Sequence, residues 1–453
     1  MIKKWLGNIL PQKRNDKTVQ YHPFIANIDS FAAEQVLQRL HQAGFNAYLV
    51  GGAVRDLLLG IEPKDFDIVT NATPQQICHI FRRSRIVGRR FPIAHVMIGP
   101  ETIEVTTFRS GGKVRQNEDG RIMHDNHYGT IDQDAMRRDF TCNALYYDVQ
   151  RQQIIDYHNS VADIKARKIV MIGDPLSRYQ EDPVRILRAI RLAGKLGFEI
   201  DEATAAPIAS CTALLSKEPV SRLFDELLKI LFSGHAQSCL KQLTLLGEVD
   251  NIHPLLDVMY QATKLPHFHL INHTLAQTDK RIKEGKSVSI GFILATLLWH
   301  EVDERWLAAQ QSGQSPTAAM HTAITQLKEN LDHNWGITHR HSATMREIWL
   351  LQAQFLHRNG KRPHRLMTHP RFRAAYDFLL LLATNNERFA KTAQWWKNFQ
   401  AAESEQRWQM TQPTQNNTYK NSSTKKKRRP SHKKIKEKPT HHLDLSNDSF
   451  DDE

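Results

Sequence analysis

The apolar pattern of this chain changes at about residue 170, and this change most narrows the folds open to it. Before that point, short alternating segments typical of strands are interleaved with amphipathic helical segments. After it, EDPVRILRAIRLAGKLGF (181–198) and VSRLFDELLKILFSG (220–234) have helical period, and the pattern continues to about residue 400. The sequence therefore predicts an α+β region followed by an all-α region.

The first half has recognisable helix and strand boundaries. Asp29 or Ser30 is the expected cap of the first helix and Gly44 its stop, while Thr73 and Pro74 begin a later helix. We expect helices over 28–44, 51–60, 73–84 and from 132, strands over 46–50, 65–70 and 152–158, a hairpin around Gly99-Pro100, and a polar loop over 110–130.

The overall composition suggests a nucleic-acid partner. The net charge is +13 and the pI is about 9.5. Such a balance favours polyanions, with nucleic acid ahead of membrane lipid. The four cysteines are isolated, which indicates neither a zinc site nor a disulfide framework and fits a reducing cytosol. No apolar run approaches membrane-spanning length, so we expect no membrane insertion.

The segment KDFDIVT (64–70) holds two carboxylates two positions apart. On a strand, Asp65 and Asp67 point the same way and raise each other's pKa unless a cation lies between them. Glu104 follows on a later strand. Three convergent carboxylates can hold two Mg²⁺ ions, an arrangement that serves phosphoryl transfer. The alternative is a solvated strand face.

Three further patterns fit a nucleotide or RNA ligand. Gly51-Gly52, between a strand and a helix, lets phosphate approach the backbone, although an ordinary tight turn has the same pattern. Asp182, Arg185 and, less closely, Arg188 share a helix face and can read a base edge, or form only a surface ion-pair ladder. The candidates for binding the RNA backbone are Arg82, Arg83, Arg85, Arg89, Arg90, Lys425, Lys426, Lys427, Arg428 and Arg429.

Two aromatic pairs and the tail admit two interpretations each. Tyr146-Tyr147 and Trp395-Trp396 could stack bases, but such rings more often pack in a core. The run KKKRRPSHKK (425–434) either attracts RNA without sequence preference or only solvates the tail. We predict that residues 412–453 are disordered, basic and then acidic.

Taken together, LVGGAVRDLLLG (49–60), PKDFDIVTNATP (63–74), RRDFTCNALYYD (137–148) and EDPVRILRAIRLAGKLGF (181–198) resemble the tRNA nucleotidyltransferase and bacterial poly(A) polymerase family. GKRPHRLMTHPRFRAAYDFLLL (360–381) and WWKNFQ (395–400) extend the resemblance. IVGRRFPIAHV (86–96) is similar to the stretch that marks the poly(A) polymerases, although Pro92 stands where a basic or amide residue is usual.

The resemblance implies an architecture. It is a polymerase-β-like nucleotidyltransferase palm, a mixed sheet with helices, followed by an all-α neck and body. The implied segments are a basic N-terminal extension (1–25), the palm or head (26–170), a neck that binds nucleotide and RNA (171–235), an RNA-binding helical body (236–411) and the tail (412–453).

The resemblance also implies residue roles. Asp65, Asp67 and Glu104 would be the metal ligands, and Asp139 would be essential for catalysis near the ribose. The nucleotide-binding residues would be Gly51, Gly52, Arg55, Arg138, Asp139, Asn143, Glu181, Asp182, Arg185 and Arg188, with Arg191 extending the basic wall.

The implied activity is addition of poly(A) to RNA 3′ ends from ATP, with Mg²⁺ or Mn²⁺. The expected setting is the cytoplasm, in mRNA processing and RNA decay, and the sequence leaves open whether the RNA decay machinery is a partner. The alternatives are a CCA-adding tRNA nucleotidyltransferase on the same scaffold and a catalytically inactive RNA-binding protein.

Overall fold

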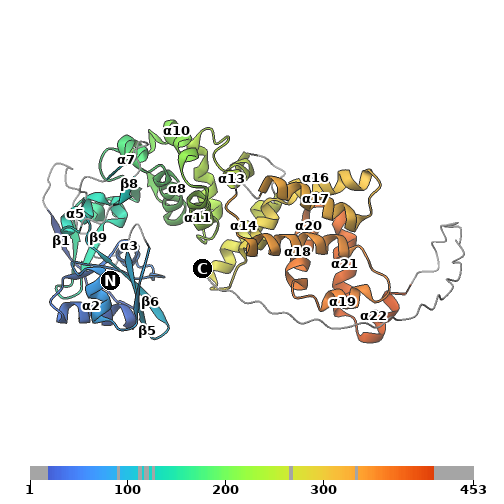
Figure 1. Cartoon of the computed structure of the whole chain (residues 1–453), viewed down its shortest axis with the longest axis horizontal. Helices are drawn as coiled ribbons and strands as arrows, with labels where there is room; N and C mark the ends of the chain where they lie inside the picture. The colour runs from blue at the N-terminus through green and yellow to red at the C-terminus, as the bar shows by residue number, and fades with distance from the viewer. Residues whose placement is uncertain are drawn as a thin grey trace, which may run out of the picture. The chain divides into compact units, whose positions relative to one another are not determined.

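The computed structural model describes residues 19–88, 92–110, 115–116, 122–124, 128–264, 269–331 and 335–412 (Figure 1). The N-terminal part is built on a mixed eight-stranded sheet of order β1-β10-β9-β2-β3-β6-β5-β4. Its strands are β1 (Gln20–Pro23), β2 (Ala47–Val50), β3 (Asp67–Thr70), β4 (Ser84–Val87), β5 (Ile93–Ile98), β6 (Glu101–Thr107), β9 (Leu145–Asp148) and β10 (Gln153–Asp156).

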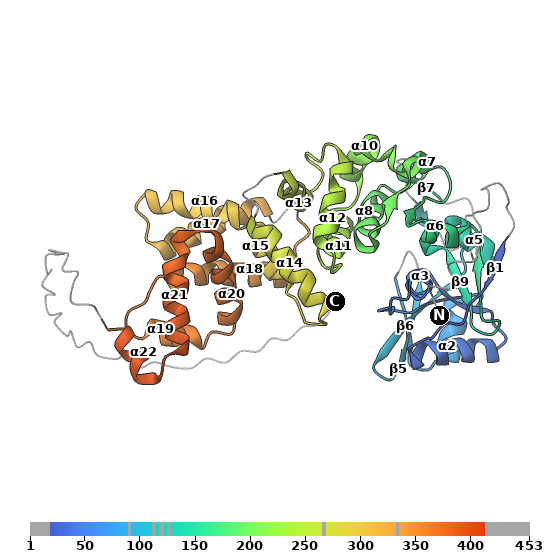
Figure 2. The same cartoon turned by 180° about the vertical axis from the view of Figure 1, so that it is seen from behind.

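The two faces of this sheet are covered unequally. Alternate residues such as Leu49, Ile68 and Val105 join the main hydrophobic core, which includes helix α2 (Figure 2). The opposite face carries a small separate cluster that includes Val50, Val69 and Tyr146. The helices of this part are α2 (Phe31–Gln42), α3 (Gly52–Leu59), α4 (Pro74–Ile80), α5 (Ile131–Arg137) and α6 (Ser160–Lys165).

Local sequence signals explain most of these boundaries. The Ser30 side chain caps α2 by accepting from the Ala33 amide at 3.0 Å. Thr73 and Gln76 form a capping box at the start of α4. β5 and β6 form the predicted hairpin, and Gly99 at its turn has φ +59°.

Three sequence predictions were wrong in detail. β3 begins at Asp67, so Asp65 lies in the preceding loop. Val50 pairs with Asp67 at the end of β2, and a longer β3 would place Asp65 opposite Gly52, which already belongs to α3. The expected loop 110–130 contains two short paired strands, β7 (Arg115–Gln116) and β8 (Ile122–His124).

The third difference lies where strand patterns fade. β11 (Lys168–Ile169) and β12 (Glu199–Ile200) form a short parallel pair, and no further strand follows β12 in the described residues. The helices after β11 are α7 (Pro175–Glu181), α8 (Val184–Leu196), α9 (Glu202–Ala205), α10 (Ile208–Cys211), α11 (Val220–Leu231), α12 (Ala236–Gln242), α13 (Pro254–Lys264), α14 (His269–Lys283), α15 (Ile290–Leu297), α16 (Trp299–Gln311), α17 (Pro316–Leu331), α18 (His339–Phe355), α19 (Arg362–Met367), α20 (Phe372–Asn385), α21 (Glu387–Ala401) and α22 (Ser404–Met410).

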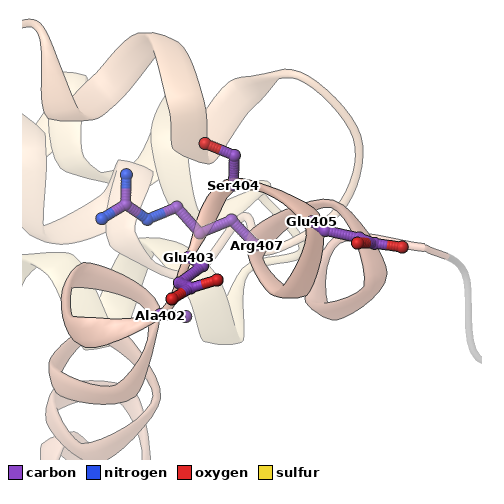
Figure 3. A pocket seen from close by; sticks show the side chains of 5 residues that line it. All are labelled: Ala402, Glu403, Ser404, Glu405 and Arg407. Carbon is purple, nitrogen blue, oxygen red and sulfur yellow. The ribbon is translucent and has the colours of Figure 1, made fainter.

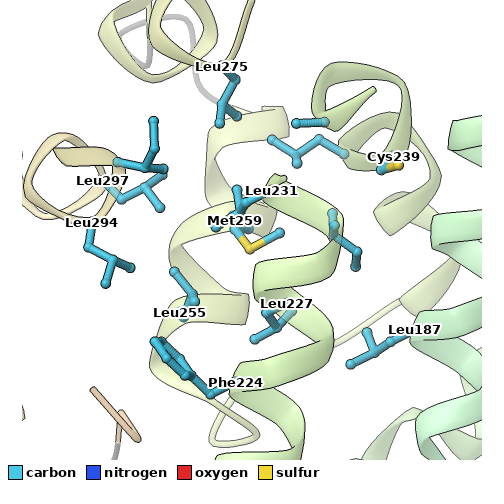
Figure 4. Close-up of a cluster of buried hydrophobic side chains, with 14 of the residues drawn as sticks. Leu187, Phe224, Leu227, Leu231, Cys239, Leu255, Met259, Leu275, Leu294 and Leu297 are labelled. Carbon is cyan, nitrogen blue, oxygen red and sulfur yellow. The ribbon is translucent and has the colours of Figure 1, made fainter. Parts of the chain in front are cut away.

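A continuous apolar core joins successive helices of this region. Figure 4 shows Leu187 of α8, Leu227 of α11, Met259 of α13 and Leu294 of α15 among its buried side chains. The described residues up to Thr411 form one compact unit, and the finer boundaries between head, neck and body stay predictions. Within the described residues, no helix has the length and apolar character needed to cross a membrane.

The aromatic pairs pack inside. Tyr146 and Tyr147 are 0% and 2% exposed, which excludes base stacking on either ring in this structure. Trp396 is fully buried, and Trp395 stacks on Phe399 with ring centroids 4.8 Å apart. The core interpretation is therefore confirmed for Tyr146, Tyr147 and Trp396, whereas Trp395 is partly exposed and packs against the edge of the core.

Candidate active site

The sheet places two of the predicted acids side by side. Asp67 of β3 pairs in register with Glu104 of the parallel strand β6, so both side chains leave the same face. Val50, which pairs with Asp67 in the same row, belongs to the smaller apolar cluster. The two acids therefore lie on the face of the sheet that carries this cluster. Asp65 is exposed in the loop immediately before β3.

The neighbouring acids affect the protonation of Asp67. The Asp67 side chain is exposed, yet nearby protein atoms remove part of the hydration of its carboxyl. This desolvation, followed by the charges of Glu104 and Asp65, raises the pKa of Asp67 to about 6, and Arg138 opposes the rise. The site therefore has an excess of negative charge.

The carboxylates fit a divalent cation by chemistry but do not form a closed cage. Within the described ranges, no group of three His, Cys, Asp or Glu side chains lies close enough to hold a metal ion. The predicted tight trio is thus not assembled by these side chains as they lie. The donor set is nevertheless one of hard oxygens, and a bound cation would offset both the desolvation and the neighbouring negative charges that raise the pKa of Asp67.

The glycine turn stands beside this acidic face. Gly51 has φ +73° and ψ −127°, a conformation that side-chain-bearing residues rarely adopt. Its amide donates to the Leu145 carbonyl at 3.1 Å, which fixes the turn against β9. A Cβ at Gly51 would lie 3.7 Å from Nη1 of Arg138. The first N–H groups of α3, beginning at Gly52, have no partner within the helix.

Arg55 is buried and already engaged. Its Nε and Nη2 donate to Asp56 at 2.8 and 2.7 Å, and its Nη1 donates to Oδ1 of Asn143 at 2.6 Å. With 3% exposure, its guanidinium supports the loop of Asn143 in this structure. A direct contact with triphosphate would require these bonds to rearrange.

Arg138 belongs to a second network on the same side of the sheet. Its Nε and Nη2 donate to Oδ2 of Asp134, at 3.1 and 2.8 Å, and its Nε also reaches the Tyr146 hydroxyl at 3.0 Å. Arg137 donates twice to Oδ1 of Asp134 at 3.0 Å. Burial alone would raise the pKa of Asp134, but Arg138 and Arg137 hold it below its ordinary value.

Asp139 connects the head to the following helices. Its Oδ1 accepts from the Phe140 amide at 2.8 Å, and its Oδ2 lies 2.7 Å from Nη2 of Arg188 on α8. Asp139 is only 7% exposed. Arg191, one turn further along α8, pairs instead with Glu226 at 3.4 Å.

The expected base-reading residues do not share one helix face. Asp182 lies between α7 and α8, whereas Arg185 and Arg188 are on α8. A break at Pro183 separates the two helices, so the prediction of a single continuous face was wrong for Asp182. Oδ2 of Asp182 accepts from Arg222 of α11 at 2.8 Å. Burial would raise the pKa of Asp182, but Arg222, Arg185 and Arg188 lower it.

Glu181 is occupied by two arginines. Its Oε2 accepts from Nη1 of Arg178 at 2.7 Å and from Nη1 of Arg185 at 2.6 Å. The structure thus brings Glu181, Asp182 and Arg185 together, but their polar atoms are largely paired with protein groups.

Sequence reasoning missed several residues of this site. Asp134 could have been found from its spacing, since it pairs with Arg137 at i+3 and Arg138 at i+4. His95 has its Nε2 3.6 Å from Oε1 of Glu104, a neighbour that only the hairpin register reveals. Arg178 and Arg222 act across elements, and their spacing in the sequence gives no signal of this.

The basic candidates are only partly described. Arg82, Arg83 and Arg85 are exposed. Arg85 pairs with His95 across β4 and β5, and His95 pairs with Glu104, so a positive charge flanks the acids in one row. Arg89, Arg90, Lys425, Lys426, Lys427, Arg428 and Arg429 lie outside the described residues.

Comparisons with known proteins agree with this arrangement. Residues 47–170 match the family described as "Poly A polymerase head domain". Residues 197–259 match "Probable RNA and SrmB- binding site of polymerase A", and residues 312–434 match "Polymerase A arginine-rich C-terminus".

Individual relatives point the same way. The chain is 40% identical over 395 residues to "Poly(A) polymerase I" of Haemophilus influenzae, covering 84% of this chain and 87% of that one. It is 40% identical over 205 residues to the "CCA-adding enzyme" of Lactobacillus helveticus, but this covers only 45% of this chain and 51% of the other.

The fold has a solved counterpart, a "tRNA-processing enzyme (apo form 2)", with a TM-score of 0.54 and 21% identity over 83% of this chain and 100% of that chain. This likeness concerns the fold alone. With the relative from Haemophilus influenzae matched over most of both lengths, the chain belongs to the bacterial poly(A) polymerase family of nucleotidyltransferases.

Proposed function

We propose that this protein is a polynucleotide adenylyltransferase that uses ATP to add a poly(A) tail to RNA 3′ ends. The proposal rests on the 40% identity of the chain to a poly(A) polymerase I over 84% of its length. The paired acids Asp67 and Glu104 lie within the residues that match the head-domain family. The RNA 3′-hydroxyl would attack the α-phosphorus in line, and pyrophosphate would leave.

The turn at Gly51 would receive the triphosphate. Glycine at φ +73° leaves the backbone open, and the α3 N-terminus favours negative charge. Arg138, held beside Gly51 by Asp134 and Tyr146, would direct its guanidinium toward the phosphates. Arg55 would act one step away by fixing Asn143, whose carbonyl accepts from Arg138 at 3.3 Å.

The acidic face would define where the chemistry occurs. Asp67 and Glu104, with Asp65 from the adjoining loop, are the proposed ligands of Mg²⁺ or Mn²⁺. Such an ion would lower the pKa of the RNA 3′-hydroxyl and neutralise triphosphate charge. Asp139 would lie near the ribose, where Arg188 holds its carboxylate at 2.7 Å.

The base would be read at the junction of α7 and α8. Asp182 and Arg185 offer an acceptor and a guanidinium fork whose positions are fixed by Arg222 and Glu181. A prearranged edge of this kind can discriminate bases because a wrong base leaves buried polar groups unpaired.

The RNA backbone would follow basic surface. Arg82, Arg83 and Arg85 are exposed, Arg85 lies in the same row of paired residues as Glu104, and the run 425–429 would add salt-dependent attraction. We further propose a cytoplasmic role in mRNA processing and RNA decay, because an unstructured 3′ tail gives exonucleases a landing place. The four free cysteines fit a reducing compartment.

A nucleotide-selection assay tests the proposal. Purified protein is incubated with an unstructured RNA or with a tRNA that lacks its CCA end, with each nucleotide separately and with ATP and CTP together, in the presence of Mg²⁺ or Mn²⁺. Long products made with ATP alone support it. A product limited to CCA on tRNA supports the alternative that the match to the Lactobacillus helveticus enzyme favours. RNA binding without any extension would favour an inactive RNA-binding protein.

A further inference from the structure

Arg178 connects two parts of the candidate site. It lies on α7, and its Nη2 donates to the carbonyls of Arg137 and Arg138 at 2.8 and 2.7 Å. Arg137 is the last residue of α5 and Arg138 its C-cap. The final carbonyls of a helix lack partners within the helix, so Arg178 supplies one from a distant element.

The other end of the same guanidinium holds the base-reading junction. Nη1 of Arg178 donates to Oε2 of Glu181 at 2.7 Å, and Arg185 donates to the same oxygen at 2.6 Å. Nη1 of Arg185 also donates to the backbone carbonyl of Arg178 at 2.7 Å. The Arg178 side chain is 16% exposed and that of Arg185 is 11% exposed, whereas the Glu181 side chain that accepts from both is 34% exposed, so the guanidinium groups are more shielded from water than the carboxylate they share.

The residues next to this contact carry the proposed phosphate and ribose functions. The Arg138 side chain lies beside Gly51, and the Asp139 carboxylate faces Arg188. A shift of the α5 carbonyls would therefore move Arg138 and Asp139 together. Conversely, a shift of Arg185 on binding a base would pull on Glu181 and Arg178.

We infer that Arg178 is a positioning residue that couples base recognition by Asp182 and Arg185 to the placement of Arg138 and Asp139. Glu181 then serves as the anchor of this link and does not read the base. The inference rests on the proposed adenylyl transfer. It explains why an arginine is needed, because one planar guanidinium can bond two carbonyls and a carboxylate at once, whereas a lysine ammonium cannot match that geometry.

The chain provides a matched control. Arg407 of α22 also donates to two carbonyls at the end of a helix, those of Phe399 at 2.9 Å and Gln400 at 2.8 Å near the end of α21. Figure 3 shows the Arg407 side chain with Glu403 and Ser404 at this surface. The substitution R407A removes the same type of contact in the body without touching the candidate site.

The experiment compares wild type, R178A, R178K and R407A in extension of an RNA oligonucleotide with ATP or CTP. For R178A we expect kcat/KM for ATP to fall about 10- to 100-fold, with a lower ratio of ATP to CTP use, because charge-assisted hydrogen bonds are lost. R178K should lose less. Millimolar guanidinium should restore part of the R178A rate and none of any R407A loss. Melting temperatures are measured in parallel.

Each outcome decides between explanations. An R178A protein with wild-type kcat/KM and nucleotide ratio would overturn the inference, as would an R407A protein with the same kinetic changes. If R178A does not fold, R178K carries the test, and a wild-type ratio in that variant counts against coupling. A wild-type protein that makes no ATP-dependent tail contradicts the proposed function instead.

Discussion

Asp67 and Asp134 lie on the same side of one sheet but in opposite electrostatic surroundings. Asp134 is fully buried and accepts from Arg137, Arg138 and Tyr146, so its pKa is lowered. Partial desolvation, followed by the charges of Glu104 and Asp65, raises the pKa of Asp67 to about 6. Val50 lies between Tyr146 and Asp67 in a single row of paired residues, so the Cα atom of Tyr146, whose hydroxyl bonds Asp134, is about 10 Å from that of Asp67.

The difference shows which carboxylate has its charge compensated by protein groups and which does not. The charge of Arg138 affects the pKa of both acids, but the carboxylate to which it donates hydrogen bonds is that of Asp134. A carboxylate that is fully compensated within the protein stabilises the fold. One left beside other carboxylates is better suited to a cation from outside. The contrast supports Asp67 as the functional acid and Asp134 as the structural one.

The largest effect should come from removing the Asp67 charge. We expect Asp67→Asn to reduce ATP-dependent extension by about 10³-fold or more, since charge compensation dominates phosphoryl transfer. Its melting temperature without divalent ions should not fall, because the charged carboxyl is disfavoured in the folded state. Extension assays and thermal unfolding measure the two effects.

Asp132→Asn is the control for this change, since Asp132 is an exposed acid on α5. It should leave extension close to wild type. Near-wild-type activity in the Asp67 variant would end its assignment as a functional acid.

The converse should hold for Asp134. Asp134→Asn leaves Arg137 and Arg138 without their anion, so we expect a loss of about 3 kcal/mol in the free energy of unfolding. Denaturant unfolding at neutral pH measures it. A variant as stable as wild type would show that this network is not structural, and the comparison with Asp67 would collapse.

A smaller effect should appear in the pH dependence of cation binding. Below pH 6 the Asp67 carboxyl holds a proton that an incoming ion must displace. The affinity for Mn²⁺ should therefore fall by up to about tenfold per pH unit below 6 and level off above 7. Titration of Mn²⁺ by electron paramagnetic resonance from pH 5 to 8 tests this, and a flat profile would contradict it. Asp67→Asn should flatten the slope.

Without metal ions, Asp67 and Asp134 should change the free energy of unfolding in opposite directions as pH rises. The pKa of Asp67 is higher in the folded protein than its ordinary 3.8. Its contribution to the free energy of unfolding therefore favours the folded state at low pH and is lost as pH rises toward 6. The pKa of Asp134 is lower in the folded protein than its ordinary 3.8. Its contribution to the free energy of unfolding is therefore present above pH 3.8 and is lost as pH falls through its pKa in the folded protein.

How much of this could be predicted from sequence depended on the range of each interaction. The strand holding Asp67, the hairpin that carries Glu104 and the glycine turn at Gly51 follow from local patterns, and the structure has each of them. The α+β class followed from the change in period near residue 170.

What could not be predicted depends on pairing between distant segments. Asp65 falls outside β3 because β2 ends at Val50, a limit set by the partner strand. Arg222 of α11, which donates to Asp182, and Tyr146 of β9, which accepts from Arg138, are partners that no spacing in the sequence specifies. The types of residue in the site could therefore be predicted, but their hydrogen-bond and ion-pair partners from distant segments could not.

The smallest effect tests how Arg138 is oriented. The Tyr146 hydroxyl donates to Asp134 at 2.8 Å and accepts from Arg138 at 3.0 Å, so Tyr146→Phe should cost about 1 kcal/mol of stability and raise KM for ATP a few-fold. Tyr147 is the matched control, since it follows on the same strand, points to the opposite face, and accepts only from the Ala26 amide at 3.2 Å among the hydrogen bonds of the described chain. Tyr147→Phe should leave KM unchanged. Both changes remove one hydroxyl, but only Tyr146→Phe alters the hydrogen bonds of Asp134 and Arg138. Equal KM values in the two variants would therefore show that the Tyr146 hydroxyl does not orient Arg138.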